Sequence, residues 1–244
     1  MPHILALDTS TDACSVAVVT ESRTVERYTL EPRSHARLGL PMVDEVLTEA
    51  GITLSDVDAI AFGRGPGSFT GLRIAAGLAQ GLAFSRQLPV VPVSTLEAMA
   101  SGLLVAKPEV FKAESGNADP STGERWILSL LDARMNEVYA AWYRVVNGSV
   151  ELVGEEKVIP PSMLELPSAD ISTIAVGSGL NYFKEFPIDT QKSIAIQDSD
   201  WYPRAASVGK LALSYFAEGR VVTPADAQPV YLRDEVTWKK LPGR

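Results

Sequence analysis

The sequence predicts an α/β protein of two similar lobes, each built on a mixed β-sheet flanked by helices. The first hundred residues read as three strands followed by alternating helices and strands, which form a sheet with helices on its faces. A polar stretch at 106–125, rich in Gly, Pro and Ser, separates the halves. The second half then repeats the opening hairpin, whose first strand ends in aspartate. This repeat favours internal duplication and a cleft between the lobes.

The elements of the first half follow from hydrophobic periodicity and from residues that begin and end helices. Apolar runs predict buried strands, alternation predicts a more exposed strand, and a period of 3.6 predicts helices. Ser34 and Gly51 are the expected limits of the first helix, in which Pro41 marks a kink or a later start. Thr70 is the expected cap of the second helix. The expected strands are 4–10, 14–20, 24–30, 57–63 and 88–94, and the expected helices are 34–51, 70–86 and 95–104.

The second half has fewer helical segments than the first. Residues 126–146 predict two strands around a short turn, and 150–155 a third strand. Residues 173–186 read as strand, glycine turn and helix, and 204–219 as an amphipathic helix. The expected domains are a first lobe at 1–104, a reduced second lobe at 105–202, and a C-terminal helix and tail at 203–244 that pack back across the lobes.

Composition restricts the function. The net charge of −8 makes the chain poorly suited to neutralise nucleic-acid phosphates by itself, because that affinity depends on Lys and Arg. The single cysteine, Cys14, excludes an internal disulfide. The N-terminus lacks a basic region, and the most apolar stretch, 70–84, carries Arg73, Gln80 and three glycines. We therefore expect a cytoplasmic protein without a membrane span.

The segment AFGRGPGSFTGLR at 61–73 is the strongest local candidate for a binding site. It places glycines and backbone N–H groups at a helix N-terminus, where partial positive charge favours an anion. It lacks the lysine of a phosphate-binding Walker loop and the glycine spacing of a dinucleotide fingerprint. Spacing alone therefore favours a rigid turn over a nucleotide site. The candidates for nucleotide or anion binding are Asp8, Thr9, Gly65, Gly67, Ser68, Thr70 and Arg73.

Other chemistry is sparse. Asp8, at the end of the first strand, would bind hydrated magnesium in a nucleotide cleft or would cap its own turn. The equivalent turn at 132–136 has no glycine that would let a phosphate approach the backbone. The glycines of 177–179 would receive an adenine or would serve the turn alone. The two histidines and Cys14 form neither a metal-ligand spacing nor a nucleophile–base pair.

The predicted helix at 70–86 carries unusually small residues on its surface. Gly77 and Gly81 lie four residues apart on one face, where they would let another helix approach closely. Each glycine costs a helix up to about 1 kcal/mol, so close packing should compensate for it. That packing is either with a partner or within the subunit, and the sequence leaves both open. The helix at 34–51 is likewise apolar over a wide arc.

Segments from the first strand to the tail together resemble the TsaB (YeaZ) family. The block RGPGSFTGLR is the most specific, and the match is densest through residue 100. The segments are ILALDTSTDACSVAV, LPMVDEVLTEAG, RGPGSFTGLRIAAGLAQGLA, PVVPVSTLEAMA, LDARMNEVY and PVYLR with WKKLPG. The resemblance implies an actin-like ATPase fold and a role in making threonylcarbamoyladenosine beside the anticodon of tRNA. It also implies pairing with the catalytic paralogue TsaD, recruitment of the ATPase TsaE, and homodimer formation when the chain is alone.

The resemblance also implies roles for particular residues. Thr95 and Met99 occupy the positions of the TsaD metal histidines, so no metal site and no catalytic residue are expected. The chain would be a non-catalytic scaffold or activator that meets tRNA only through the complex. No cofactor is expected to bind tightly, and ATP or ADP would bind weakly at the interface of the complex. The alternative is an enzyme, an ATPase or a glycoprotease-like peptidase. The implied partner interface comprises Leu38, Met42, Val43, Val46, Leu72, Ile74, Ala76, Gly77 and Gly81.

Overall fold

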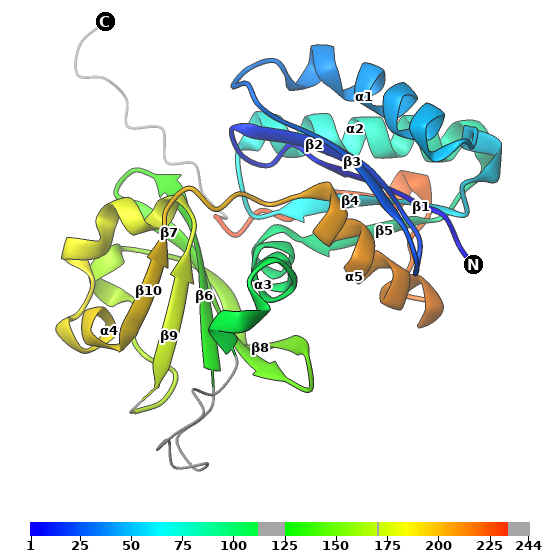
Figure 1. Ribbon diagram of the computed structural model, residues 1–244. Helices are drawn as coiled ribbons and strands as arrows, with labels where there is room; N and C mark the ends of the chain where they lie inside the picture. The colour runs from blue at the N-terminus through cyan, green and yellow to red at the C-terminus, as the bar shows by residue number, and fades with distance from the viewer. Residues whose placement is uncertain (112–124, 170, 234–244) are drawn as a thin grey trace, which may run out of the picture.

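The computed structural model describes residues 1–111, 125–169 and 171–233, and it contains two five-stranded mixed sheets (Figure 1). Most of the predicted linker and the last eleven residues of the predicted tail lie outside these ranges. The first sheet has the order β3-β2-β1-β4-β5 and the second β10-β9-β6-β7-β8. The strands of the first sheet are β1 Ile4–Asp8, β2 Ala13–Val19, β3 Thr24–Leu30, β4 Ala59–Gly65 and β5 Val90–Ser94. Those of the second are β6 Arg125–Arg134, β7 Glu137–Val146, β8 Ser149–Ile159, β9 Ser172–Val176 and β10 Ile194–Asp198.

The two sheets share one topology. In each, three consecutive strands form an antiparallel meander, and the first of them pairs in parallel with the fourth, which pairs in parallel with the fifth. The second sheet repeats this with β6, β7 and β8 followed by β9 and β10. Asp8 pairs with Ser15 at the end of the first hairpin, and Asp132 pairs with Val138 near the end of the second. The internal duplication predicted from the hairpins therefore extends through both sheets.

The described residues also form five α-helices. They are α1 His35–Ala50, α2 Phe69–Arg86, α3 Thr95–Ala106, α4 Ile188–Ser193 and α5 Ala205–Ala217. Helices α1 and α2 cover one face of the first sheet, and α5 covers the other (Figure 1). The alternation of each strand decides which side chains go to which face. Leu5 and Phe62 belong to the core under α1 and α2, whereas Ala6 and Ala61 belong to the core under α5.

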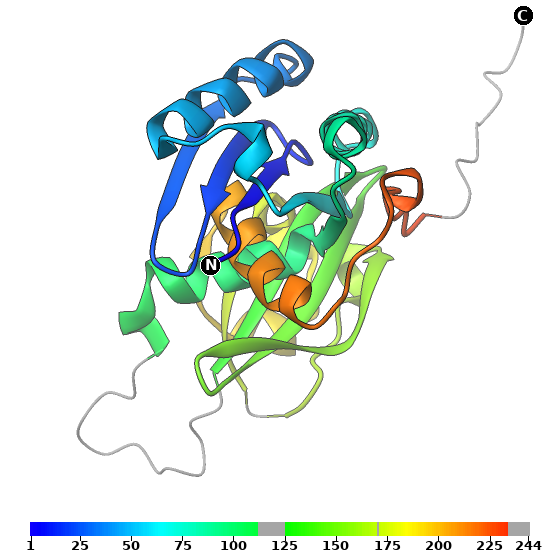
Figure 2. The ribbon, with the colours of Figure 1, turned by 90° about the vertical axis from the view of Figure 1, so that its right-hand side faces the viewer.

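Helices α3 and α5 connect the lobes. Each follows the fifth strand of its own sheet, and they pack against each other between the two sheets (Figures 1 and 2). Helix α5 approaches the first sheet closely because Gly209 has no side chain. A Cβ there would lie 2.5 Å from Val19 Cγ2 and 3.3 Å from Ala6 Cβ. Helix α3 contributes Met99 and Leu103 to a core shared with the second sheet.

The predicted elements are confirmed in order and type for the first lobe, with ends shifted by up to two residues. Pro41 lies inside α1 without ending it, and Gly51 closes that helix with φ of 75°. Ser34 occupies the N-cap position, but its side chain makes no capping hydrogen bond. In the second lobe the predicted helix after β9 is wrong in type, since residues 178–185 form a 3₁₀ helix. The short α4 and the edge strand β10 were not predicted.

Candidate functional site

The glycine loop joins β4 to α2 and packs on the turn that follows β1. The Ser68 side chain, not Thr70, caps the helix, because its Oγ accepts the Gly71 N–H at 3.4 Å. Thr70 is exposed within the first turn, so the predicted cap is wrong by two residues. The Ser68 N–H donates to the Ser10 carbonyl at 2.7 Å, and the Thr9 hydroxyl donates to the Gly71 carbonyl at 2.7 Å. These bonds tie the loop to the first hairpin.

Three glycines of this region have a steric role. A Cβ on Gly71 would lie 1.9 Å from the Thr9 carbonyl oxygen, and one on Gly67 would lie 2.4 Å from the Ser10 carbonyl oxygen. Gly65 has φ of 109°, and a Cβ there would lie 2.8 Å from the Val230 carbonyl oxygen. In each case a backbone atom of this chain occupies the space that the missing side chain leaves. The arrangement shows a packing role for these glycines, and the predicted anion site at the loop stays a prediction.

Asp8 is buried beneath this loop, with 1% of its surface exposed. Its Oδ1 accepts the Ser10 N–H at 3.0 Å and the Ser10 hydroxyl at 2.8 Å, so it caps its own turn. Its Oδ2 packs on the Cα of Gly63, where a Cβ would lie only 2.0 Å away. Burial raises the pKa of Asp8 from 3.8 to about 6, because its effect is larger than that of the hydrogen bonds from Ser10, which lower the pKa. Asp8 thus caps its own turn through Oδ1, while Oδ2 is buried and has no hydrogen-bond partner among the described residues; its predicted role towards magnesium stays a prediction.

The equivalent turn of the second lobe is closed in the same way. Asp132 Oδ1 accepts the Arg134 N–H at 2.8 Å, and the Asp132 N–H donates to Ser178 Oγ at 3.0 Å. Gly177, with φ of 102°, packs on the backbone of Leu130, where a Cβ would lie 2.1 Å from the carbonyl oxygen. The glycines after β9 therefore serve a tight strand-to-helix turn. Their arrangement gives no support to an adenine site.

The two residues expected at the positions of the TsaD histidines lie one turn apart in α3. Thr95 and Met99 are both fully buried, and the Met99 side chain belongs to the core between α3 and the second sheet. The hydroxyl of Thr95 has no hydrogen-bond partner within the described residues. Across residues 1–111, 125–169 and 171–233, no cluster of three His, Cys, Asp or Glu side chains is placed to hold a metal ion.

No helix in the described part of the chain combines the length and the apolar character that a membrane span requires.

Arg73 follows the loop on α2 and joins an exposed aromatic pair. Its guanidinium lies 3.6 Å from the centre of the Phe69 ring, and its Nε–H donates to the Tyr231 hydroxyl at 3.1 Å. The two rings are 5.5 Å apart, and each residue is about half exposed. The Nε–H of Arg73 is thus taken within the chain. Its predicted role towards an anion stays a prediction.

The residues of the implied partner interface divide into two sets. Leu38 and Ile74 are partly buried, and Gly77 and Gly81 are exposed with no atom within 4 Å of a Cβ built on either. The other members are corrected, because the apolar faces of α1 and α2 pack on the first sheet and take these side chains away from the surface. The buried members are Met42, Val43, Val46, Leu72 and Ala76.

The close contact between α1 and α2 uses a different glycine. A Cβ on Gly39 would lie 2.6 Å from Leu78 Cδ1. Within the described chain the close approach of the two helices is therefore made at Gly39, which was not predicted, and not at Gly77 or Gly81. The surface beside those two glycines carries exposed apolar side chains, including Phe84 on the same helix, which is 79% exposed.

A buried polar cluster between the lobes was not predicted. The Glu156 carboxylate of β8 accepts a hydrogen bond from the Ser94 hydroxyl and lies 3.4 Å from the Arg64 guanidinium. Its side chain is 7% exposed. Nearby, Glu97 of α3 accepts a hydrogen bond from Tyr215 of α5, and burial raises the pKa of Glu97. In the sequence Glu156 looks like its neighbours on an exposed strand, so only the contact between lobes identifies it.

The duplicated sheets and the helices between them define a two-lobed protein of the actin-like ATPase fold. A family model described as “TsaD: tRNA N6-adenosine threonylcarbamoyltransferase” matches residues 29–201. The chain is 39% identical to “tRNA threonylcarbamoyladenosine biosynthesis protein TsaB” of Haemophilus influenzae, with 99% of this chain and 98% of the relative covered. Its identity to the TsaB of Escherichia coli strain K12 is also 39%, with 99% of both covered. The chain belongs to the TsaB (YeaZ) family.

A solved structure supports the same assignment. “YeaZ from Pseudomonas aeruginosa” superposes with a TM-score of 0.84 at 40% sequence identity, covering 95% of this chain and all of that one. The similarity therefore extends over both lobes.

Proposed function

We propose that this chain acts in the biosynthesis of threonylcarbamoyladenosine in tRNA, as a non-catalytic subunit that supports a TsaD-type transferase. The names of its full-length relatives support the modification pathway. The closed turns at Asp8 and Asp132 and the buried Thr95 and Met99 support a role other than chemistry. An ATPase or peptidase would need a metal centre or an activated nucleophile, and the described residues contain no cluster of three His, Cys, Asp or Glu side chains placed to hold a metal.

The observation that carries the proposal is the exposure of Gly77 and Gly81 in the middle of α2. Glycine in a helix interior costs about 1 kcal/mol relative to alanine. Among residues 1–111, 125–169 and 171–233, no packing contact above the two glycines compensates for that cost, because the space there is open. A helix of a second protein that packs across them would compensate for it. The surface between α1 and α2 is accordingly our proposed site for TsaD, and for a second copy when the chain is alone.

Two further parts of the proposal concern the other partners. TsaE joins the pair formed by this chain and TsaD, and any ATP or ADP binds weakly at the interface of that complex. The net charge of −8 supports indirect contact with tRNA, because a basic partner is better suited to hold the phosphates.

The test is size-exclusion chromatography with light scattering on this chain alone, on TsaD alone and on their mixture, with and without TsaE and ATP. We expect a heterodimer that forms as the homodimer disappears, since both would use one surface. Gly81→Leu should prevent both assemblies without lowering the melting temperature of the dilute chain, which should rise slightly because leucine favours a helix more than glycine does. Ala217→Leu, at an exposed position of α5, is the matched control and should not affect either assembly.

Failure of all three proteins to associate would refute the partner assignment. Unchanged assembly by the Gly81→Leu chain would refute the surface while leaving the partner in place. The competing enzyme hypothesis makes a separate prediction. ATP or peptide hydrolysis by the purified chain, lost on replacing Asp8 by alanine, would support it.

A further inference from the structure

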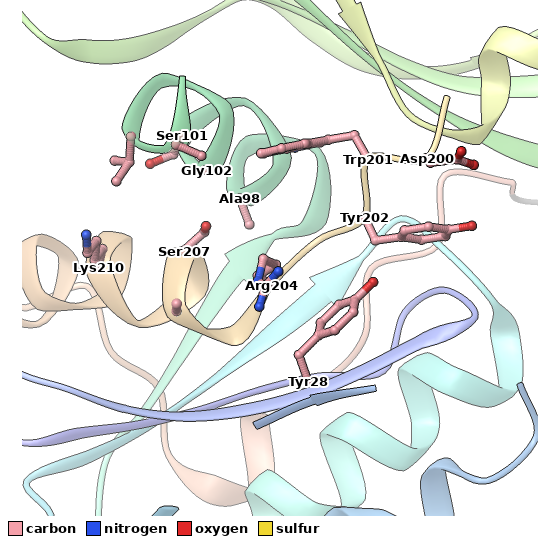
Figure 3. A pocket seen from close by; sticks show the side chains of 13 residues that line it. Tyr28, Ala98, Ser101, Gly102, Asp200, Trp201, Tyr202, Arg204, Ser207 and Lys210 are labelled. Atoms are coloured by element: carbon pink, nitrogen blue, oxygen red, sulfur yellow. The ribbon is translucent and has the colours of Figure 1, made fainter. Parts of the chain in front are cut away.

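A cavity of about 380 Å³ lies between α3, α5 and the segment that joins β10 to α5 (Figure 3). Its walls include the aromatic rings of Tyr28, Trp201 and Tyr202, and its lining contains no residue of the glycine loop or of the turn after β1. The volume falls within the range of about 300–1,000 Å³ that is usual for small-molecule sites. Nothing in the proposed function uses this cavity.

One aromatic wall is held in place by the chain itself. The indole N–H of Trp201 donates to the Met99 carbonyl of α3 at 3.0 Å. The Lys107 ammonium lies 5.4 Å from the centre of the indole ring and pairs with Asp198 at 2.8 Å. The ring is therefore fixed before any ligand enters. Fixed side chains reduce the ordering cost of binding.

The opposite wall is also fixed. The Arg204 guanidinium lies 4.3 Å from the centre of the Tyr28 ring and pairs with Glu26 at 2.8 Å. Glu26 is largely buried and also accepts the Ala206 N–H at 2.9 Å. The charge of Arg204 is thus balanced inside the protein. The Arg204 guanidinium covers one face of the Tyr28 ring, and a planar guanidinium held in this way can itself stack on a planar ring in the cavity.

Besides Arg204, the charged residues that line the cavity are Lys210 and Asp200, which Figure 3 shows at opposite ends of it. Among residues 1–111, 125–169 and 171–233, no carboxylate lies within ion-pair distance of the ammonium group of Lys210. Ser207, three residues before it on the same face of α5, and Ser101 on α3 carry hydroxyls with no hydrogen-bond partner in the same ranges. Figure 3 shows these three side chains around the part of the cavity away from Tyr202. An ammonium group beside two hydroxyls suits an anionic group.

We propose that this cavity binds a small molecule with a planar aromatic ring and one anionic group, either phosphate or carboxylate. The ring lies between Trp201 and the Arg204 guanidinium that stacks on Tyr28. The anionic group meets Lys210 and the two serine hydroxyls at the end of the cavity away from Asp200 (Figure 3). A nucleoside monophosphate and an aromatic carboxylic acid share this chemistry. The site belongs to this chain alone and requires no partner protein.

The test is isothermal titration calorimetry on the full chain, with saturation-transfer NMR to identify the bound group. The probes are AMP, UMP and indole-3-acetate, which carry ring and anion together, and adenosine and inorganic phosphate, which carry one each. We expect at least one probe of the first set to bind about tenfold more tightly than both probes of the second set. Tighter binding of a nucleotide assigns the phosphate source, and tighter binding of indole-3-acetate assigns the carboxylate source. Absence of saturable binding by every ring-plus-anion probe would overturn the proposal.

Two variants locate the binding. Lys210→Gln changes an exposed side chain and should weaken the best probe about tenfold without changing the affinity for adenosine. Lys192→Gln, at an exposed position of α4, is the matched control and should change nothing. Ser101→Phe should fill the cavity and abolish binding, with circular dichroism showing that the chain is folded. Equal weakening by both lysine variants, or full binding by a folded Ser101→Phe chain, would place the ligand elsewhere and overturn the proposal.

Discussion

Replacing the two exposed glycines of α2 by alanine should make the isolated chain more stable. Gly77 and Gly81 lie in the helix interior, and a Cβ on either would meet no atom within 4 Å. The substitution therefore adds no clash and gains the difference in helix propensity, about 0.8–1.0 kcal/mol at each site. For a domain of this size, each kcal/mol raises the melting temperature by about 2–4 °C.

The assay is urea unfolding followed by circular dichroism at low protein concentration, so that self-association does not contribute to the measured stability. The control is Gly71→Ala in the first turn of the same helix. Its Cβ would lie 1.9 Å from the Thr9 carbonyl oxygen, a backbone atom that cannot move away. That variant should lose at least about 2 kcal/mol or fail to fold.

A destabilised Gly77→Ala or Gly81→Ala chain under these conditions would refute the reasoning. It would mean that the two glycines support packing within the subunit, and the proposed partner surface would lose its main support. The same variants should weaken assembly with TsaD while they stabilise the dilute chain, because alanine occupies space that the partner helix needs. Opposite signs in the two assays are the specific signature of an interface.

Three further predictions concern polar side chains. Burial raises the pKa of Asp8 to about 6, so the native carboxyl stays neutral where the unfolded one has ionised, and its cost to stability grows from about pH 4 to about pH 6. The effect of Asp8→Asn on the free energy of unfolding, measured in urea melts, should therefore be about 2–3 kcal/mol more favourable at pH 7.5 than at pH 4. An equal effect at both pH values would contradict this. Glu156→Ala should lower the free energy of unfolding by about 1–3 kcal/mol, whereas Glu155→Ala, on the exposed side of the same strand, should change it by less than about 0.5 kcal/mol. Ser68→Ala should cost about 0.5–2 kcal/mol and Thr70→Ala almost nothing, the reverse of what the sequence suggests.

The order of elements could be predicted because local chemistry decides it. Apolar strands, helical periodicity and end signals such as Gly51 act within a few residues, so the first lobe was predicted almost completely. The second lobe was predicted less well. Its segment after β9 has a glycine turn and apolar residues, but the chain there is held by packing of Gly177 and Gly179 on Leu130 and forms a 3₁₀ helix.

The candidate site likewise has features that local sequence predicts and features that depend on contacts between distant segments. Sequence reasoning identified the glycine loop, Asp8 and the paired glycines of α2 as unusual, because glycine and aspartate at such positions have few local explanations. It could not decide between a phosphate and a neighbouring backbone as the group that fills the loop. The backbone that packs against the loop comes from the hairpin at Thr9 and Ser10, some sixty residues earlier in the chain, and local sequence does not reveal it.

By itself the sequence determined the fold class, the duplication of the hairpins and the family, because these depend on patterns that run along the chain. Only the tertiary structure decided which faces of α1 and α2 are buried, that Gly39 and not Gly81 makes their contact, and that Glu156 connects the lobes. It alone brought Tyr28, Trp201 and Lys210 to one cavity. The physical reason is that burial and charge pairing depend on neighbours in space, and those neighbours come from strands and helices far apart in the sequence.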